Sequence, residues 1–183
     1  MRRLPTRIPD LILIQPDVHR DERGFFVETF HADRYAALGI TTELVQDNHS
    51  RSAQGVLRGL HFQLGTGQPK LVRAVRGRAF DVAVDIRPAS PTFGQYEAFT
   101  LDDEDHLQIW IPAGFAHGFC ALSEWTDVAY RVGSYYDPQA ERGLAWNDPE
   151  VGITWPVAEP VMSARDAANP RLRDLMAELT TIG

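Results

Sequence analysis

The sequence has 183 residues, 44% hydrophobic and 23% charged, which is the size and balance of one globular domain able to fold alone. A formal net charge of −7 argues against a nucleic-acid-binding surface, because phosphate binding normally requires a net basic patch. A single cysteine, Cys120, excludes an intrachain disulfide framework and a cysteine-based zinc site, and it favours a reducing compartment.

The N-terminal segment carries no targeting signal that we recognise. Its apolar run before Gln15 has four residues, which is too short for the hydrophobic region of a signal peptide. No later stretch approaches the length of a membrane span. We therefore expect a cytoplasmic protein, and the absence of repeats or linker-like segments predicts that residues 1–183 form one domain.

Short β-strands are predicted along most of the chain. In chain order, β-rich runs bounded by Gly, Pro or Asp occupy residues 11–15, 24–30, 44–50, 56–63, 71–76, 80–87, 95–101, 107–111, 118–122 and 126–134. The clearest is 80–87, where large apolar side chains alternate with small or charged ones, the period of a half-buried strand.

Helical patterns are confined to residues 32–38 and 172–179, and both are short. A parallel sheet would need a crossover helix between strands, and the strand-rich region contains none. The predicted fold class is therefore all-β, an antiparallel jelly roll with short peripheral helices.

Two segments, 46–63 and 111–119, each place a histidine among aromatic residues and glycines. A lone histidine in an apolar strand is more often a hydrogen-bonded core residue than a functional one. However, Pro112, Gly114 and His117 resemble the second motif of the cupin superfamily, whose conical barrels present inward-facing groups in a cavity. The resemblance implies a cupin-like jelly-roll barrel.

A metal site is not expected. Metal-binding cupins supply a His-x-His pair and a downstream Glu from their first motif, whereas the matching segment 60–63 contains His61 alone. Two imidazoles without a third protein ligand make a poor zinc or iron site, which disfavours a metal-dependent oxygenase or isomerase. No glycine-rich dinucleotide fingerprint follows a strand, so we predict neither a metal nor a cofactor.

Without a metal, a histidine in a barrel suits proton transfer, because its ordinary pKa of about 6.5 lies near the operating pH. His61 is thus a candidate base. Arg58 and Lys70 flank it in sequence, and buried cations indicate a phosphate or a developing oxyanion. The alternative for both cations is ion pairing with an Asp or Glu at a strand end.

Strand alternation tests whether these residues can share one cavity. Arg58 falls on the face opposite His61 unless the strand is bulged between them, which Gly59 would permit. In 126–132, alternation points Tyr130 inward with two valines. The commoner explanation for a buried tyrosine hydroxyl is a structural hydrogen bond.

The polar segments occur in the order and near the spacing of dTDP-4-dehydrorhamnose 3,5-epimerases, a family that the chain resembles from 21–30 to 163–166. The matching segments between these are 46–50, 55–63, 70–72, 81–87, 90–94, 114–119 and 141–149. The resemblance implies a cupin-like homodimer that inverts C3 and C5 of dTDP-4-dehydro-6-deoxy-D-glucose, giving dTDP-4-dehydro-L-rhamnose.

By this resemblance His61 is the base and Tyr130 the acid, while Asp166 orients the imidazole and Lys70 stabilises the enolate oxygen. The implied substrate-binding residues are Arg23, Glu28, Gln46, Asp47, Asn48, Arg58, His117, Tyr136, Glu141 and Arg165, with Arg23 and Glu28 reaching across the dimer. The physical logic agrees, since C3 and C5 flank one carbonyl and inversion needs an acid facing the base.

Two alternatives stay open. The first is a relative of the same fold that inverts C3 or C5 alone on a related dTDP-4-keto-6-deoxy sugar, because the same base and acid would serve. A non-catalytic sugar-binding cupin would share the cavity and would tolerate loss of the proton-transfer groups.

Overall fold

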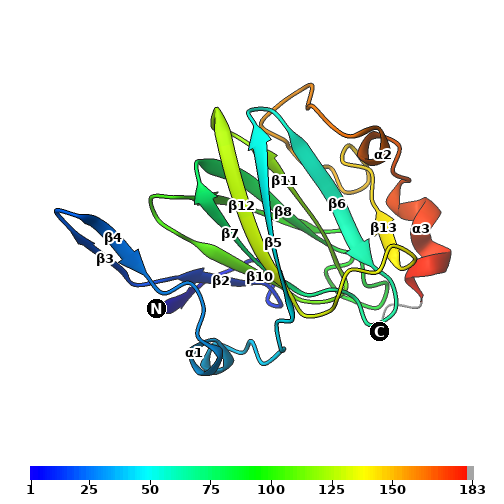
Figure 1. Ribbon diagram of the computed structural model, residues 1–183. Helices are drawn as coiled ribbons and strands as arrows, with labels where there is room; N and C mark the ends of the chain where they lie inside the picture. The colour runs from blue at the N-terminus through cyan, green and yellow to red at the C-terminus, as the bar shows by residue number, and fades with distance from the viewer. Residues whose placement is uncertain (181–183) are drawn as a thin grey trace.

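A computed structural model describes residues 1–180 as two facing antiparallel sheets (Figure 1). The six-stranded sheet has the order β1 (Arg2–Leu4), β2 (Ile12–Gln15), β10 (Gln108–Ile111), β7 (Lys70–Arg76), β12 (Trp125–Val132) and β5 (Gln46–Ala53). The five-stranded sheet has the order β13 (Glu141–Gly143), β6 (Leu57–Gln63), β11 (Phe115–Ala121), β8 (Arg78–Asp85) and β9 (Tyr96–Asp102). The prediction of an all-β jelly roll is confirmed.

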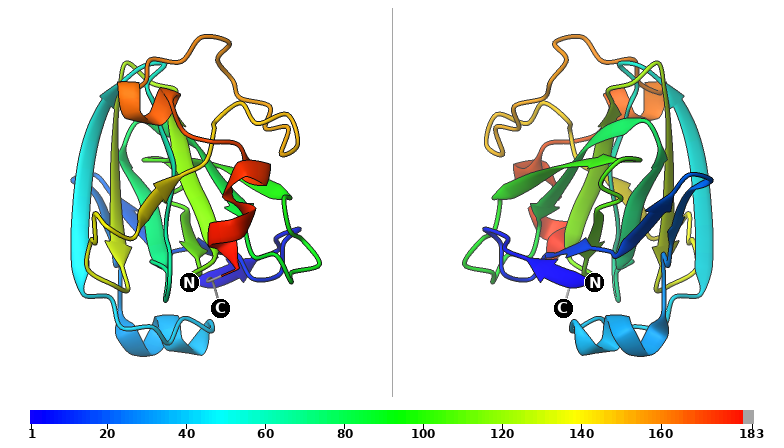
Figure 2. Two further views of the ribbon diagram at one scale, coloured as in Figure 1. Left: turned by 90° about the vertical axis from the view of Figure 1, so that its right-hand side faces the viewer. Right: turned by 90° about the vertical axis from the view of Figure 1, so that its left-hand side faces the viewer.

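The remaining elements surround this sandwich. A hairpin of β3 (Val18–Asp21) and β4 (Gly24–Val27) projects away from it, and α1 (Ala32–Ala37) lies at its lower edge in Figure 1. Near the C-terminus, α2 (Ala164–Ala167) and α3 (Leu172–Leu179) lie beside the five-stranded sheet (Figure 2). The predicted helix 172–179 is found with the same ends, and the predicted helix 32–38 and all ten predicted strands are found with altered ends, whereas β1, β3, β13 and α2 were not predicted.

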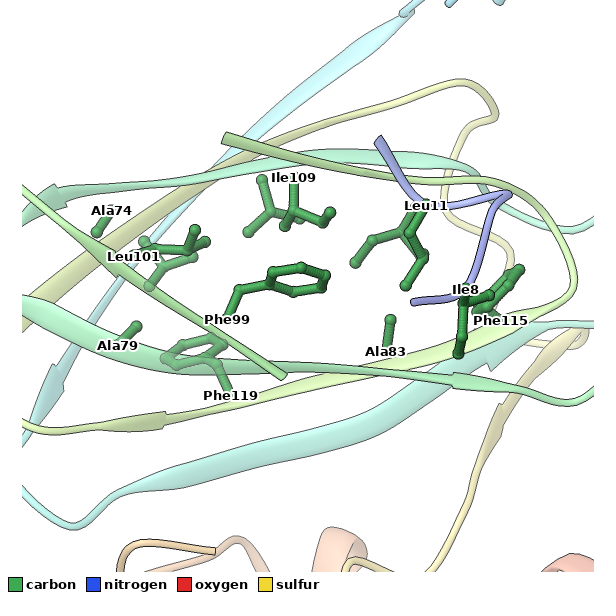
Figure 3. Close-up of a cluster of buried hydrophobic side chains, with 13 residues drawn as sticks. Ile8, Leu11, Ala74, Ala79, Ala83, Phe99, Leu101, Ile109, Phe115 and Phe119 are labelled. Atoms are coloured by element: carbon green, nitrogen blue, oxygen red, sulfur yellow. The ribbon is translucent and has the colours of Figure 1, made fainter. Parts of the chain in front are cut away.

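The main hydrophobic core fills the space between the two sheets (Figure 3). Phe99 and Ile109 face each other from opposite sheets, and Phe115 and Phe119 add two more rings from β11. Small residues of β8, such as Ala83, leave room for these rings. The core occupies one part of the barrel, so the other part can hold a polar cavity.

The prediction that strand 80–87 is half-buried is wrong. Val82 and Val84 pack outward against Leu172 and other side chains of the C-terminal segment, while the alternate residues face the barrel interior. Asp81 and Asp85 are both 0% exposed. Because α3 covers the outer face of this sheet, small or charged residues at every second position do not indicate a solvent-exposed face here.

Candidate active site

A cavity of about 560 Å³ lies between the sheets. The five-stranded sheet lines it through β6, β11 and β13, the six-stranded sheet through β5, β7 and β12, and α2 adds residues at one side. His61, Lys70, Tyr130 and Glu141 also line a second cavity of about 290 Å³. The two cavities therefore adjoin at these four side chains. Their combined volume is that expected of a site for a ligand of several rings.

His61 is paired with Asp166. Its Nε2 lies 2.7 Å from Oδ1 of the carboxylate, whose Oδ2 accepts a bond of 3.2 Å from the Gly59 backbone N–H. Burial alone would raise the pKa of Asp166, but these hydrogen bonds and the neighbouring imidazole hold it below its ordinary value. A carboxylate accepts, so the proton of the pair lies on Nε2 and Nδ1 is left as the basic nitrogen of His61.

A bulge in β6 brings Arg58 and His61 into the same cavity. Arg58 pairs with Phe119 of β11 and His61 pairs with His117, so β6 uses three steps where β11 uses two. Gly59 lies within the bulge at φ +112°, and a Cβ there would come within 2.7 Å of the β11 backbone. The predicted bulge at Gly59 is thus confirmed.

Tyr130 reaches the cavity from the opposite sheet, as alternation along β12 predicts. Burial, and then the Glu141 carboxylate, raise the pKa of its phenol, so the hydroxyl stays protonated at neutral pH. Within residues 1–180 this hydroxyl has no hydrogen-bond partner. The structural hydrogen bond that commonly explains a buried tyrosine is therefore not found, and the phenol is free to act on a ligand.

Lys70 is a buried cation, 6% exposed, extending from β7. Its Nζ donates to the backbone carbonyl of His61 at 3.3 Å. Burial lowers the pKa of the ammonium to about 8, although the carboxylates of Asp81 and Glu141 oppose this change. The group is therefore still mostly charged at neutral pH, and it can donate to an oxyanion beside His61.

A second histidine–aspartate pair lies next to the first. His117 Nε2 is 2.9 Å from Oδ2 of Asp81, and the two side chains are 6% and 0% exposed. Burial lowers the pKa of His117, even though Asp81 favours its protonation. His117 was predicted as a site residue, whereas Asp81 was not, because its place in an apparently half-buried strand suggested a solvent-facing carboxylate.

A polar network borders the second cavity. The carboxylate of Glu141 accepts from the Tyr136 hydroxyl at 2.9 Å and lies 2.5 Å from Nη2 of Arg165. The Gln46 side chain donates to Asn48 at 2.9 Å and accepts from the Tyr136 backbone N–H at 3.2 Å. The structure therefore brings these five predicted residues together at the mouth of the site.

Comparison with known proteins identifies the family. Residues 5–174 match the family model described as dTDP-4-dehydrorhamnose 3,5-epimerase. The protein of that name from Shigella flexneri is 48% identical over 176 residues, which cover 95% of this chain and 97% of the Shigella protein. This chain belongs to the dTDP-4-dehydrorhamnose 3,5-epimerase family. It is accordingly an epimerase, and the alternative of a non-catalytic sugar-binding cupin is set aside.

Two further relatives bear on the activity of this epimerase. A solved 3,5-epimerase structure from Legionella pneumophila Philadelphia 1, in complex with dTDP-4-keto-L-rhamnose, is 50% identical with a TM-score of 0.94, covering 97% of this chain and 96% of that one. A dTDP-4-dehydrorhamnose 3-epimerase from Streptomyces niveus is 42% identical over 168 residues, covering 91% of this chain and 81% of its own. This chain is thus similar both to a 3,5-epimerase and to a 3-epimerase.

Three predicted contacts of the epimerase lie outside the cavity within one chain. The side chain of Asp47 lies on the other face of β5, 3.4 Å from Nε of Arg131, so it could reach a ligand in the cavity only through its backbone. Arg23 is at the tip of the projecting hairpin, where it pairs with Asp21. Glu28 pairs with Arg34 at 3.0 Å. That Arg23 and Glu28 serve a partner's site stays a prediction.

Within the part of the epimerase that the structure describes, no group of three or more His, Cys, Asp or Glu side chains is arranged to hold a metal ion. Each of the two cavity histidines has an aspartate partner instead. Catalysis without a metal or cofactor stays a prediction. None of the three helices in residues 1–180 has the length and apolar character needed to cross a membrane.

Proposed function

We propose that this epimerase converts dTDP-4-dehydro-6-deoxy-D-glucose to dTDP-4-dehydro-L-rhamnose by inverting C3 and C5. The observation that carries the proposal is the position of His61 and Tyr130, which line the same two cavities from strands of opposite sheets. Inversion requires removal of a proton from one face of a carbon and delivery of another to the opposite face, and facing walls supply both groups.

The reaction follows from these positions. Nδ1 of His61 takes the proton from C5, and the electron pair of the broken C–H bond forms an enolate whose negative charge lies on the C4 oxygen. The Lys70 ammonium donates to that oxygen. The Tyr130 hydroxyl then delivers its proton to the opposite face of C5, and proton exchange with water restores both groups. Base and acid each contribute about 10²–10⁴-fold to the rate.

C3 is inverted by the same groups, because it lies on the other side of the same carbonyl. The enolate oxygen keeps its place beside Lys70, and the ring adjusts so that the C3 hydrogen faces His61. One base, one acid and one cation are therefore sufficient for two inversions. Asp166 keeps the imidazole in a single orientation through both steps.

The nucleotide part of the substrate matches the rest of the site. Arg58 and Arg165 line the first cavity and provide cations for a diphosphate. Gln46, Asn48 and Tyr136 line the adjoining cavity and offer amide and aromatic groups to a base. The complex of the Legionella relative with dTDP-4-keto-L-rhamnose supports the same class of ligand for this chain.

A homodimer is part of the proposal. The β3–β4 hairpin projects from the sandwich (Figure 1) and exposes 54% of Phe25 and 69% of Phe26. Large apolar side chains at the end of such an arm favour a contact with a second copy of the chain. The arm also carries Arg23, and Glu28 directly follows β4, so a partner's site would receive a cation and a carboxylate with it.

Proton NMR in deuterated water tests the reaction. The substrate should acquire deuterium at both C3 and C5 and give the L-rhamno product, and prior dialysis against a chelator should not change either signal. The sequence similarity to a 3-epimerase favours one rival, a mono-epimerase, which would exchange a single carbon. Deuterium at C3 alone or C5 alone would establish that rival and reject double inversion.

A further inference from the structure

Asp81 is a buried carboxylate that lies behind the cavity residue His117 and has an incomplete set of partners. Its Oδ2 is bonded to His117, but within residues 1–180 its Oδ1 has no hydrogen-bond partner. The side chain is 0% exposed, and no arginine of the described residues pairs with it. An unsatisfied buried carboxylate costs free energy, so a nearby positive charge is needed to explain its retention behind the cavity wall.

Lys70 provides that charge. Asp81 extends from β8 of one sheet and Lys70 from β7 of the other, both toward the interior between the sheets. Of the two carboxylates that stabilise the ammonium, Asp81 exerts the stronger attraction and Glu141 the weaker. The Lys70 ammonium makes one hydrogen bond to the protein within residues 1–180, to the carbonyl of His61, which leaves donors for an enolate oxygen.

The other groups around Lys70 do not replace Asp81. The titratable and charged side chains that share its cavity are Arg58, His61, His117, Tyr130, Glu141, Arg165 and Asp166. Burial lowers the pKa of His117 and raises that of Tyr130, so neither contributes a charge at neutral pH. Asp166 is bonded to His61, and Glu141 is engaged by Arg165 and Tyr136. Asp81 is the fully buried one of these carboxylates, and within residues 1–180 its Oδ1 has no hydrogen-bond partner.

On the basis of the proposed enolate chemistry, we propose that Asp81 is a positioning residue, whose carboxylate keeps the Lys70 ammonium charged where the enolate oxygen forms. The same carboxylate holds the His117 ring through its hydrogen bond. Burial already lowers the pKa of Lys70 to about 8 with Asp81 present. Loss of the Asp81 charge would lower that pKa further, and fewer molecules would carry the cation when the enolate forms.

The pH dependence of kcat/KM in Asp81→Asn tests this role. Charged Lys70 is the active form, so activity falls as pH rises through its pKa. We expect this alkaline limb to move to lower pH by about one unit or more, giving kcat/KM at pH 8 that is lower by about fivefold or more, while the acid limb stays in place. A purely structural effect would lower the whole profile without moving the limb.

Asp102→Asn is the matched control. Asp102 is also buried, at 8% exposure, on the neighbouring strand β9, but it faces Arg78 at 3.5 Å and is not one of the carboxylates that favour the charge on Lys70. The alkaline limb of the Asp102→Asn enzyme should coincide with that of the unmodified enzyme. A folded Asp81→Asn enzyme whose limb also coincides with the unmodified one would overturn the proposal.

A second variant, followed by NMR, applies if Asp81→Asn does not fold. Asp81→Ser is smaller and equally uncharged, so it should lower the pKa of Lys70 below that of the unmodified enzyme, observed by carbon-13 NMR of the Lys70 ε-carbon. A Lys70 signal that titrates identically in both proteins would overturn the proposal. This measurement needs no substrate, so its result is independent of whether the enzyme inverts C3, C5 or both.

Discussion

Nε2 of His61 lies 2.7 Å from Oδ1 of Asp166, although 105 positions separate the two residues in the sequence. Asp166 belongs to the four-residue helix α2, whose N-cap Ser163 accepts from the Asp166 backbone N–H at 3.0 Å. The second carboxylate oxygen accepts from the backbone N–H of Gly59, within the bulge in β6. Asp166, which orients the base of the proposed reaction, therefore comes from a C-terminal segment, and each of its carboxylate oxygens has a partner on β6.

Asp166→Asn should lower kcat by about 10²–10⁴-fold, because an amide can donate to the imidazole and favour the wrong tautomer, and it cannot stabilise the imidazolium. Affinity for dTDP, measured by calorimetry, should change little, since Asp166 bonds to His61 rather than to the nucleotide. A folded variant with kcat within a few-fold of the unmodified enzyme would show that the imidazole needs no carboxylate.

Tyr130→Phe should separate proton removal from inversion. His61 can still remove a proton and return a deuteron to the same face, so NMR in deuterated water should show exchange with retention, while product formation falls about 10²-fold or more. Stability should change little, because within residues 1–180 the lost hydroxyl has no hydrogen-bond partner. Equal losses of exchange and inversion would argue against Tyr130 as the acid.

Much of the fold was predictable because each long strand carries its own alternating pattern. The missed strands β1, β3 and β13 have three or four residues each, too few to show a period, and they are defined by the strands with which they pair. The prediction of 24–30 as one strand failed at its end, since β4 stops at Val27 where the hairpin ends. Pairing, rather than local pattern, sets these limits.

The site was predictable where a residue type carries chemistry in a local pattern. His61, Tyr130 and the bulge at Gly59 follow from alternation in two strands. Asp81 could not be found in this way, because a carboxylate on the face of β8 that carries small and charged residues looks solvent-facing until α3 is known to cover the other face. The contact between His61 and Asp166 needs the whole tertiary fold.

Lys70 should make the stability of the enzyme depend on pH. Its pKa falls from 10.5 in the unfolded chain to about 8 in the fold, so the folded state binds fewer protons than the unfolded state between these values. Stability from this group therefore rises with pH across that window, by up to about 3 kcal/mol. Below pH 8 the full cost of burying the cation is present.

Lys70→Met isolates this contribution. The free energy of unfolding, measured by urea titration, should increase from pH 8 to 10.5 in the unmodified enzyme relative to Lys70→Met, since other groups titrate in both proteins. If the difference between the two proteins is constant over this range, Lys70 is not buried as a cation, and its assignment as the enolate donor loses its electrostatic basis.

Subunit mixing tests the proposed exchange of arms. His61→Asn lacks the base, and Arg23→Ala/Glu28→Ala lacks the polar groups carried by the hairpin, so each homodimer should be nearly inactive. In a mixed dimer the arm of the His61→Asn subunit would complete the site of its partner, which keeps His61. Because half of the dimers in an equimolar mixture are mixed and each has one complete site, about one quarter of the normal activity should return.

Two controls define that experiment. Each variant mixed with itself should stay inactive, which excludes an effect of the refolding or exchange procedure. If Arg23 and Glu28 instead served the site of their own chain, a mixed dimer would contain no complete site and mixing would restore nothing. Sedimentation of the mixture should show dimers in both cases, so a failure to recover activity with dimers present would reject the cross-subunit contribution specifically.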